Sequence, residues 1–429
     1  MLIDLPYGKK RIITLEVPDE NIYFIIDRSK LPTLKNIKKK ISQALKNPID
    51  ASPLLKMVKP RNKVLIIGDD ITRPTPQNLI LPTLLNELNK IGISDNNIEI
   101  IIGLGTHRYM TDKEIEEKYS KEVIERVSVL NHNYKDRNQL INMGKTESGI
   151  PISVNKKLYE ADFIISTGNI VPHLTAGWGG GGKSIQPGVS GEETTEQTHI
   201  MAAKMYVRGE RLVGDPDNKM RKEIEAVALK AGLKMIINTV LNEKDEISNI
   251  FIGDVIKAHR KGVEYAKQAY CPKIPGLADI VIVACHPADI DYWQGTKPLS
   301  YAIEAVKPRG TVILIAEFPD GISPTHPAIK DMGAWSCKEV LEAIEKGNVP
   351  YDDLIAASAM LVHSKIREKV EIICYSEGIS ESDKEALGML HASTLEEAIE
   401  MAFKSQRKDA KVGILKCGEI LPILEQSQT

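Results

Sequence analysis

The sequence predicts an α/β fold made of two α/β domains, with mainly parallel, buried sheets and a cleft between them. The first observation is that short runs rich in apolar and β-branched residues alternate with longer amphipathic segments. The second is that most of these runs are apolar at every position, which is typical of parallel strands buried on both faces. The eight expected strands are residues 63–67, 98–102, 161–166, 235–240, 278–283, 311–316, 370–374 and 411–415.

Amphipathic helices are expected between the strands. In the clearest of them, apolar residues recur at the spacing of one helical face from Leu395 to Phe403. The helix after the first strand is expected to begin with Thr75 as the N-cap and Pro76 at the first helical position. The alternation of strands and helices predicts right-handed crossovers between parallel strands.

The boundary between the two domains is expected in residues 271–276. Two prolines and a glycine interrupt the pattern there, and a new strand follows. We therefore expect an N-terminal domain over residues 1–273 and a C-terminal domain over residues 274–429. The boundary segment is also the expected hinge, with the active site between the domains.

Charge and cysteine content exclude several classes of function. The 429 residues contain 56 Lys and Arg and 58 Asp and Glu, for a net charge of −2, which is not the basic footprint of a nucleic-acid-binding protein. The five cysteines form no CxxC pair, so neither a disulfide framework nor a cysteine-rich zinc site is expected. No apolar run reaches about 18 residues, and the first residues do not resemble a signal peptide. We therefore expect a cytoplasmic protein that binds neither nucleic acid nor a membrane.

Polar segments follow four of the expected strands, at the positions where ligands bind in open α/β sheets. Three of them contain Arg73, His107 and His173, which would meet in one crevice if the first three strands are neighbours. Each segment also has a plainer interpretation, because an Asp such as Asp70 often begins a turn and a lone His is more often a hydrogen-bonded loop residue. Two histidines at strand ends of one domain favour the functional interpretation, whereas His286, after a later strand, stays ambiguous. The other histidines near no motif are expected to be structural and without polar partners, namely His132, His259, His326, His363 and His391.

The densest unusual segment is Gly177-Trp178-Gly179-Gly180-Gly181-Gly182-Lys183-Ser184. It matches the P-loop pattern G-x-x-x-x-G-K-[ST], in which backbone N–H groups hold phosphate. That pattern needs a strand directly before it and a helix that begins at the lysine, whereas the expected strand ends near Ser166 and Pro187-Gly188 follow the lysine. A flexible loop with an exposed lysine is the plainer interpretation. Four successive glycines lose much backbone entropy on folding, however, which favours a place where a ligand approaches the backbone. Beyond the loop, His199 is either a solvated helix residue or a metal ligand.

Together these motifs resemble those of the nickel-pincer-dependent lactate racemase catalytic subunit and its 2-hydroxyacid racemase and epimerase relatives. Singly the pieces are weak, but they occur in the order of that family and span most of the chain. They are Leu5-Pro6-Tyr7, Asp70-Ile71-Thr72-Arg73-Pro74, Gly105-Thr106-His107-Arg108, His173 with Ala176-Gly177, Gly181-Gly182-Lys183-Ser184 with Pro187-Gly188, His199, and Gln294 with Lys297.

The resemblance implies a cofactor and a role for each matching residue. The cofactor is a nickel(II) pyridinium-3,5-bisthiocarboxylate mononucleotide, in which two sulfur atoms and one carbon hold the metal. It would be attached covalently to Lys183, with His199 as the fourth nickel ligand. His107 and His173 would be the two acid/base histidines of this cofactor-binding, catalytic N-terminal domain, over which the C-terminal domain would close. The remaining matches would line the cofactor pocket (Asp70, Ile71, Thr72 and Arg73) or contact the substrate (Arg73, Gln294 and Lys297).

The residue types suit the implied reaction, which interconverts D- and L-2-hydroxy acids, with lactate first among them. The α-hydrogen beside a carboxylate is barely acidic, so it leaves more easily as hydride to the cofactor once the hydroxyl is deprotonated. Two histidines suit proton exchange with that hydroxyl from two sides. A sulfur-rich pincer with an imidazole suits nickel(II), and Arg73 is able to bind the substrate carboxylate through two hydrogen bonds.

Three alternatives remain. The segment His173-Leu174-Thr175 and the bulky Trp178 and Trp293 depart from lactate-type members and favour a longer acid, such as a sugar acid. The glycine loop leaves open a P-loop-like phosphotransfer protein that uses the loop lysine, and a non-catalytic nucleotide-binding protein. Apart from the small 2-hydroxy acid, the expected partners are the proteins that synthesise the cofactor and bind transiently. A chain made without them is expected to be an apoprotein.

Overall fold

The computed structural model describes residues 1–425 and divides them into two compact units. Unit 1 contains Met1–Ser29, His199–Gly214 and the described residues from Gln268 onward, and unit 2 contains Lys30–Thr198 and Asp215–Lys267. The expected domain boundary between residues 273 and 274 lies near Gln268, where the chain passes from unit 2 to unit 1 for the last time. The chain passes between the units more than once, however, so one boundary does not separate them. The N-terminal strand β3 (Ile22–Ile26) belongs to unit 1 because it pairs in parallel with β19 (Val412–Leu415).

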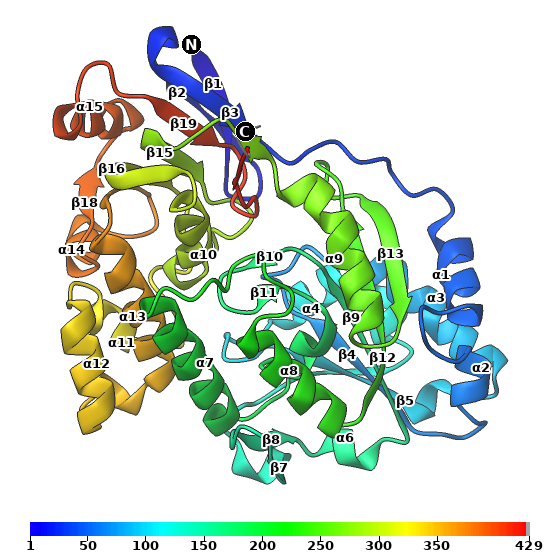
Figure 1. The fold of residues 1–429 in the computed structure, drawn as a ribbon. Coiled ribbons are helices and arrows are strands. Elements are labelled where there is room, and N and C mark those ends of the chain that lie inside the picture. The colour runs from blue at the N-terminus through cyan, green and yellow to red at the C-terminus, as the bar shows by residue number, and fades with distance from the viewer. Residues whose placement is uncertain (426–429) are drawn as a thin grey trace. The chain divides into compact units, whose positions relative to one another are not determined.

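Unit 2 is built on a six-stranded sheet (Figure 1). Its strand order is β13 (Ile247–Gly253), β12 (Leu233–Leu241), β9 (Phe163–Asn169), β4 (Val64–Asp69), β5 (Ile98–Gly103) and β6 (Ser128–Asn131). Every neighbouring pair is parallel except β12–β13, which is antiparallel. The strands β9, β4 and β5 are therefore neighbours, and their carboxyl ends lie at one edge of the sheet.

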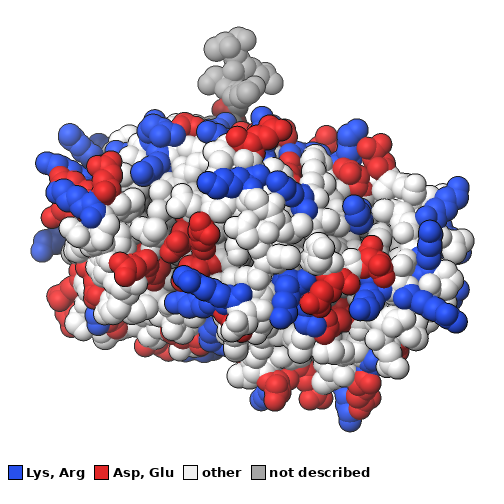
Figure 2. Space-filling model, turned by 90° about the horizontal axis from the view of Figure 1, so that it is seen from below, with Lys and Arg blue, Asp and Glu red and all other residues white. Residues whose placement is uncertain are grey.

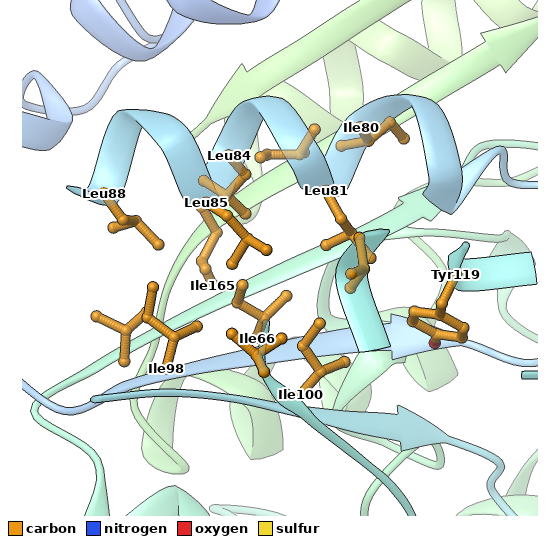
Figure 3. Close-up of a cluster of buried hydrophobic side chains, with 14 of the residues drawn as sticks. Ile66, Ile80, Leu81, Leu84, Leu85, Leu88, Ile98, Ile100, Tyr119 and Ile165 are labelled. Carbon is orange, nitrogen blue, oxygen red and sulfur yellow. The ribbon is translucent and has the colours of Figure 1, made fainter. Parts of the chain in front are cut away.

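Two apolar layers cover the faces of this sheet, because successive strand residues point to opposite sides. On β4, Ile66 packs into the layer that contains α3 (Gln77–Lys90), whereas Leu65 and Ile67 pack into the layer that contains α8 (Lys219–Lys230). Figure 3 shows the first layer, where apolar side chains of α3 lie over Ile66 and its neighbours on the sheet. Unit 2 also contains α1 (Ile37–Lys46), α2 (Leu54–Met57), α4 (Asp112–Tyr119), α5 (Lys121–Ile124), α6 (Lys157–Glu160), most of α9 (Lys257–Tyr270), and the hairpin of β7 (Leu140–Lys145) and β8 (Pro151–Asn155).

Unit 1 has its own six-stranded sheet, in which every neighbouring pair is parallel. Its order is β18 (Leu390–Ala392), β17 (Glu371–Tyr375), β16 (Val306–Ile315), β15 (Ala278–Ala284), β19 and β3. The N-terminal hairpin of β1 (Leu2–Tyr7) and β2 (Arg11–Glu16) shares a core with this sheet through residues such as Leu5 and Leu15. Among the described residues, the α-helices that lie wholly in unit 1 are α10 (Tyr292–Ala302), α11 (Ala328–Met332), α12 (Cys337–Lys346), α13 (Leu354–Arg367), α14 (Glu381–Ala386) and α15 (Leu395–Ser405).

The predicted α/β class with mainly parallel sheets is confirmed, and a strand is present at each of the eight expected positions. The expected start of the helix after β4 is wrong in detail. Helix α3 begins at Gln77 with Pro76 as its N-cap residue, and no side chain caps it. The hydroxyl of Thr75 instead donates a hydrogen bond to Asp69.

Two properties of the described residues concern membrane binding and nucleic-acid binding, neither of which the sequence predicts. Within residues 1–425, no helix combines the length and the apolar character that a bilayer span requires. On the face shown in Figure 2, Lys and Arg side chains are interspersed with Asp and Glu side chains. That mixture is what the nearly balanced charge of the sequence predicts.

Candidate active site

The loop after β4 is held by a buried carboxylate at the end of that strand. Asp69 accepts hydrogen bonds from the hydroxyl of Thr75 and from Nε2 of Gln77, at 2.9 Å, and pairs with Nζ of Lys118 at 3.3 Å. Gln77 accepts a further hydrogen bond from Oγ1 of Thr167 on β9, at 2.8 Å. Burial raises the pKa of Asp69, and Lys118 and the two hydrogen bonds only partly offset this. These contacts connect the loop to β9 and α4.

The second aspartate of this loop holds a histidine. Asp70 is 3% exposed, and its Oδ2 lies 2.5 Å from Nδ1 of His107, which follows the neighbouring strand β5. Its Oδ1 accepts from the backbone N–H and the hydroxyl of Thr72, at 3.0 and 2.5 Å. Burial alone would raise the pKa of Asp70, but His107, Arg73 and Thr72 outweigh it and hold that pKa well below its usual range. Asp70 therefore both begins a turn, as its plainer interpretation predicts, and contacts His107.

Arg73 lies within the same group of contacts. Its Nη1 donates to Oγ1 and to the carbonyl oxygen of Thr72, at 2.8 and 3.0 Å. The backbone carbonyl of Arg73 accepts from Nζ of Lys118 at 2.6 Å. Thr72 therefore orients the guanidinium, and Lys118 holds the backbone of the same residue.

His173 follows β9, on the other side of β4. It lies in the short hairpin of β10 (Pro172–His173) and β11 (Gly177–Trp178). Its Nδ1 accepts hydrogen bonds from the backbone N–H groups of Thr175 and Ala176, at 3.3 and 3.2 Å. Because β9, β4 and β5 are adjacent and parallel, the segments of His173, Asp70–Arg73 and His107 follow the same edge of one sheet.

The glycine loop lies at this edge but is not a P-loop. Lys183 lies in a single 3₁₀ turn, η4 (Gly181–Ser184), and the next helix, α7 (Glu192–Val207), begins only after the cis-proline turn that follows. The backbone N–H of Gly105, two residues before His107, donates to the carbonyl of Gly188 at 2.9 Å. The helix that a P-loop lysine begins is therefore missing from the described loop, while the loop contacts the segment of His107.

The glycines of this loop are required by the packing of the chain itself. A Cβ on Gly180 would lie 2.7 Å from Oδ1 of Asn238, and one on Gly182 would lie 2.9 Å from Cβ of Ala228. Gly180 also has a φ of +73°, a conformation that side chains disfavour. The N–H of Gly181 donates to the same Asn238 oxygen at 2.8 Å. The expectation that the glycines mark the close approach of a ligand is therefore not needed to explain them.

Two buried side chains that the sequence did not single out hold the carbonyl groups of the loop. Arg221 on α8 is fully buried and donates to the carbonyl oxygens of Ala176 and Gly180, both at 3.1 Å, and of Trp178. His259 on α9 donates through Nε2 to the carbonyl of Gly179 at 2.8 Å. Burial lowers the pKa of His259 well below its usual range, and the nearby Arg221 lowers it further. Neither residue is visible in a motif, because their partners are backbone oxygens far away in the sequence.

The expectation that the remaining histidines lack polar partners is wrong, and His259 is the first exception. Burial lowers the pKa of both His132 and His363 to about 4, so each is a neutral hydrogen-bonding group in the core. The partners are the carbonyl of Ser190 for His132, the carbonyl of Leu387 and the hydroxyl of Tyr292 for His363, Asp353 for His326, and Lys384 for His391.

One buried donor at the same edge has no partner. The side-chain amide of Asn169, the last residue of β9, is 3% exposed, and its Nδ2 donates no hydrogen bond within the described residues. Its backbone carbonyl lies beside the glycine loop, 3.0 Å from where a Cβ of Gly180 would be. Buried donors are almost always satisfied in proteins, so this amide needs an acceptor such as a water molecule or a bound group.

The other predicted residues lie in unit 1. Gln294 and Lys297 are one turn apart on α10, where Nζ of Lys297 donates to Oε1 of the buried Gln294. His286, after β15, places Nδ1 3.2 Å from Oδ1 of Asp289, whose Oδ2 accepts from the N–H of Gly8 at 2.8 Å. His199 lies on α7, at the first residue of the part of that helix that belongs to unit 1.

The chain matches known proteins along most of its length. The family models of the lactate racemase N-terminal domain and the lactate racemase C-terminal domain match residues 7–208 and 275–420. A lactate racemase of Thermoanaerobacterium thermosaccharolyticum is 32% identical over 326 residues, which are 74% of this chain and 75% of that protein. A lactate racemase of Lactiplantibacillus plantarum is 29% identical over 423 residues, which are 97% of this chain and 98% of that protein.

Solved structures agree with these matches. The structure of the lactate racemase apoprotein from T. thermosaccharolyticum superposes with a TM-score of 0.87 at 26% identity, covering 99% of this chain and 100% of that one. A crystal structure of a protein from Thermotoga maritima has a TM-score of 0.74 at 21% identity, covering 93% and 100%, and shares the fold.

Proposed function

Since the chain belongs to the lactate racemase family, we propose that it is an isomerase that interconverts the D and L enantiomers of a 2-hydroxy acid, with lactate as the first substrate to test. The observation that carries the proposal is the contact between the buried Asp70 and the partly buried His107, with His173 after the next strand but one at the same sheet edge. A carboxylate that orients an imidazole is a recurrent device for moving protons to and from a hydroxyl.

His107 is the group best placed to accept the hydroxyl proton. Asp70 contacts Nδ1, so Nε2 is the nitrogen that takes the proton. The imidazolium that forms would be stabilised by the buried carboxylate. Arg73, positioned through Thr72, supplies a positive charge for the substrate carboxylate. The proposal also includes an acid/base role for His173, which rests on the resemblance described in the sequence analysis.

A pyridinium mononucleotide attached through a lysine fits the residues at this edge. Lys183 is half-buried on η4 and supplies the amine, and the unsatisfied amide of Asn169 is a donor for a phosphate oxygen. When bound, this cofactor would accept and return the hydrogen of the substrate carbon as hydride. The three pincer donors belong to the cofactor, so one imidazole, proposed to be that of His199, would complete the nickel site. The substrate-binding roles of Gln294 and Lys297 rest on the resemblance and stay predictions.

The decisive experiment is coexpression with the cofactor-synthesis proteins, followed by intact mass, metal analysis and chiral assay of lactate. We expect a mass increment on Lys183, bound nickel and interconversion of D- and L-lactate. Lys183→Ala should lose all three, and Lys183→Arg should lose them too, because the covalent role needs an amine and not merely a charge. Lys230→Ala, at the exposed end of α8, is the matched control and should retain them.

The same experiment separates the alternatives. Full activity of Lys183→Ala would contradict the attachment, and ATP hydrolysis that depends on Lys183 would favour phosphotransfer. Turnover of sugar acids in place of lactate would retain the isomerase and change its substrate. Trp178 gives no support for a larger substrate, because its side chain is fully buried.

A further inference from the structure

We propose that His107 and His173 are held in opposite neutral tautomers, His107 with its proton on Nδ1 and His173 with its proton on Nε2. The placement of the protons rests on contacts within unit 2. Its consequence for catalysis rests on the proposed racemase function.

The tautomer of His107 follows from Asp70. An ionised carboxylate only accepts hydrogen bonds, so the ring nitrogen 2.5 Å from Oδ2 has to be the donor. The carboxylate is fixed in this orientation, since the N–H and the hydroxyl of Thr72 both donate to Oδ1. Neutral His107 therefore carries its proton on Nδ1, and Nε2 is its basic nitrogen.

The tautomer of His173 follows from the turn that it begins. The backbone N–H groups of Thr175 and Ala176 both point to Nδ1. A backbone N–H only donates, so Nδ1 has to be the unprotonated nitrogen and the proton of the neutral ring is on Nε2. The pairing of His173 with Gly177 in the hairpin closes this turn and keeps the two N–H groups in place.

The two histidines therefore present opposite chemistry to a substrate hydroxyl. A hydroxyl that faces His107 meets a basic nitrogen, whereas one that faces His173 meets an N–H group. For His173 to act as a base, its ring must lose the Nε2 proton to solvent and gain one on Nδ1, and the N–H groups of Thr175 and Ala176 must turn away. Because the reverse reaction is the forward path run backwards, this rearrangement comes before the proton transfers in one direction and after them in the other.

The kinetic signature of this difference is specific. Two enantiomers have equal free energies, so kcat/KM must be the same in both directions at every pH. The inequality of the histidines then appears in kcat and KM separately, with kcat higher and KM higher by the same factor for one enantiomer.

The test that does not depend on activity is ¹⁵N NMR of the full chain with labelled histidine. The sequence has nine histidines, and His107→Asn and His173→Asn assign the two that matter. We expect a protonated, pyrrole-type Nδ1 at His107 and an unprotonated, pyridine-type Nδ1 at His173, measured at a pH where both rings are neutral. The reverse pattern at either residue in the unmodified chain overturns the proposal.

Asp70→Asn sharpens the test. Thr72 would continue to donate to the amide oxygen, so the amide NH₂ would face Nδ1 of His107 and force its proton to Nε2. We expect the His107 pattern to invert and kcat in the loaded enzyme to fall by about 10²–10⁴-fold in both directions. Asp289→Asn, beside His286 in unit 1, is the matched control and should leave both site histidines unchanged.

The outcomes separate this proposal from the racemase function. An unchanged His107 pattern in folded Asp70→Asn overturns the tautomer assignment even if the enzyme racemises lactate. The expected ¹⁵N patterns in a chain that racemises no 2-hydroxy acid would retain the assignment and overturn the function. Equal kcat and equal KM for the two enantiomers would overturn the catalytic consequence.

Discussion

Replacement of Arg221 by methionine tests whether the glycine loop is held in place or merely flexible. The guanidinium is fully buried and donates to three carbonyl oxygens of residues 176–180. The carbonyls of Ala176 and Gly180 also accept from the backbone N–H groups of Trp178 and Lys183, at 2.8 and 3.3 Å, so the substitution removes a charged donor without emptying these acceptors; a hydrogen bond to a charged group contributes about 1.5–3 kcal/mol. Part of this is recovered, because burial disfavours the charge and lowers the pKa of Arg221 to about 10, although the nearby Glu225 opposes that shift. We therefore expect Arg221→Met to lower the free energy of unfolding by about 3–5 kcal/mol, because removal of the buried charge offsets part of the three lost hydrogen bonds.

The assay is urea unfolding, with intact mass as the functional readout. Arg221→Lys should be intermediate, because one ammonium retains the charge but does not reproduce the planar fork. Arg126→Met is the matched control in the same unit, since Arg126 is partly exposed and pairs with Asp95, so its loss should cost about 0–1 kcal/mol. In the folded fraction, Arg221→Met should also carry less cofactor on Lys183 than Arg126→Met does. An unfolding free energy for Arg221→Met equal to that of Arg126→Met would refute the reasoning.

Three further predictions follow from the site and the core. The depressed pKa of Asp70 stabilises the fold above the ordinary Asp pKa of about 3.9, and this stability is lost as pH falls toward the lower folded-state value; urea unfolding from pH 5 to 2 should therefore lose less stability with acid in Asp70→Asn than in the unmodified chain, and parallel curves would contradict this. Ile66→Ala, in the fully buried layer of Figure 3, should lower the unfolding free energy by about 2–5 kcal/mol with little change in the denaturant slope, and a loss under about 1 kcal/mol would show that the layer is loosely packed. His107→Ala and His173→Ala should each slow racemisation from both enantiomers by about 10²–10⁴-fold; initial rates with cofactor loading checked by mass decide this, and full activity of either variant would remove that histidine from the mechanism.

The sequence predicted the sheets well and the contacts of the loops poorly. Strands buried on both faces are visible as unbroken apolar runs, so all eight were found. The strand β3 was missed although its five residues, IYFII, form an apolar run, of which only Phe24 is buried in the structure. Its place in the sheet of unit 1 is also why one cut between residues 273 and 274 does not describe the chain.

In the candidate site, too, residues that directly follow strands were predicted, whereas residues that contact the loops from elsewhere were not. Asp70, Arg73 and His107 were selected from their positions after strands, and adjacent parallel strands bring them together. Arg221 and His259 were not selected, because a side chain that binds distant carbonyl groups leaves no pattern of residue types. A sequence pattern reports which strand a loop follows, whereas the second layer of contacts depends on the path of the backbone.

The neighbouring carboxylates Asp69 and Asp70 show how the backbone assigns different roles to the same residue type. Asp69, the last residue of β4, is enclosed between β9 and α4, so burial raises its pKa even though Lys118 lies 3.3 Å away. Asp70 is buried as well, but His107, Arg73 and Thr72 outweigh the burial and keep its pKa low. Adjacent titratable groups with pKa values shifted in opposite directions are typical of sites that move protons. The enclosed Asp69 fixes the loop, and the ionised Asp70 orients the imidazole of His107. If Asp70 had the surroundings of Asp69, His107 would lack the ionised acceptor that keeps its proton on Nδ1.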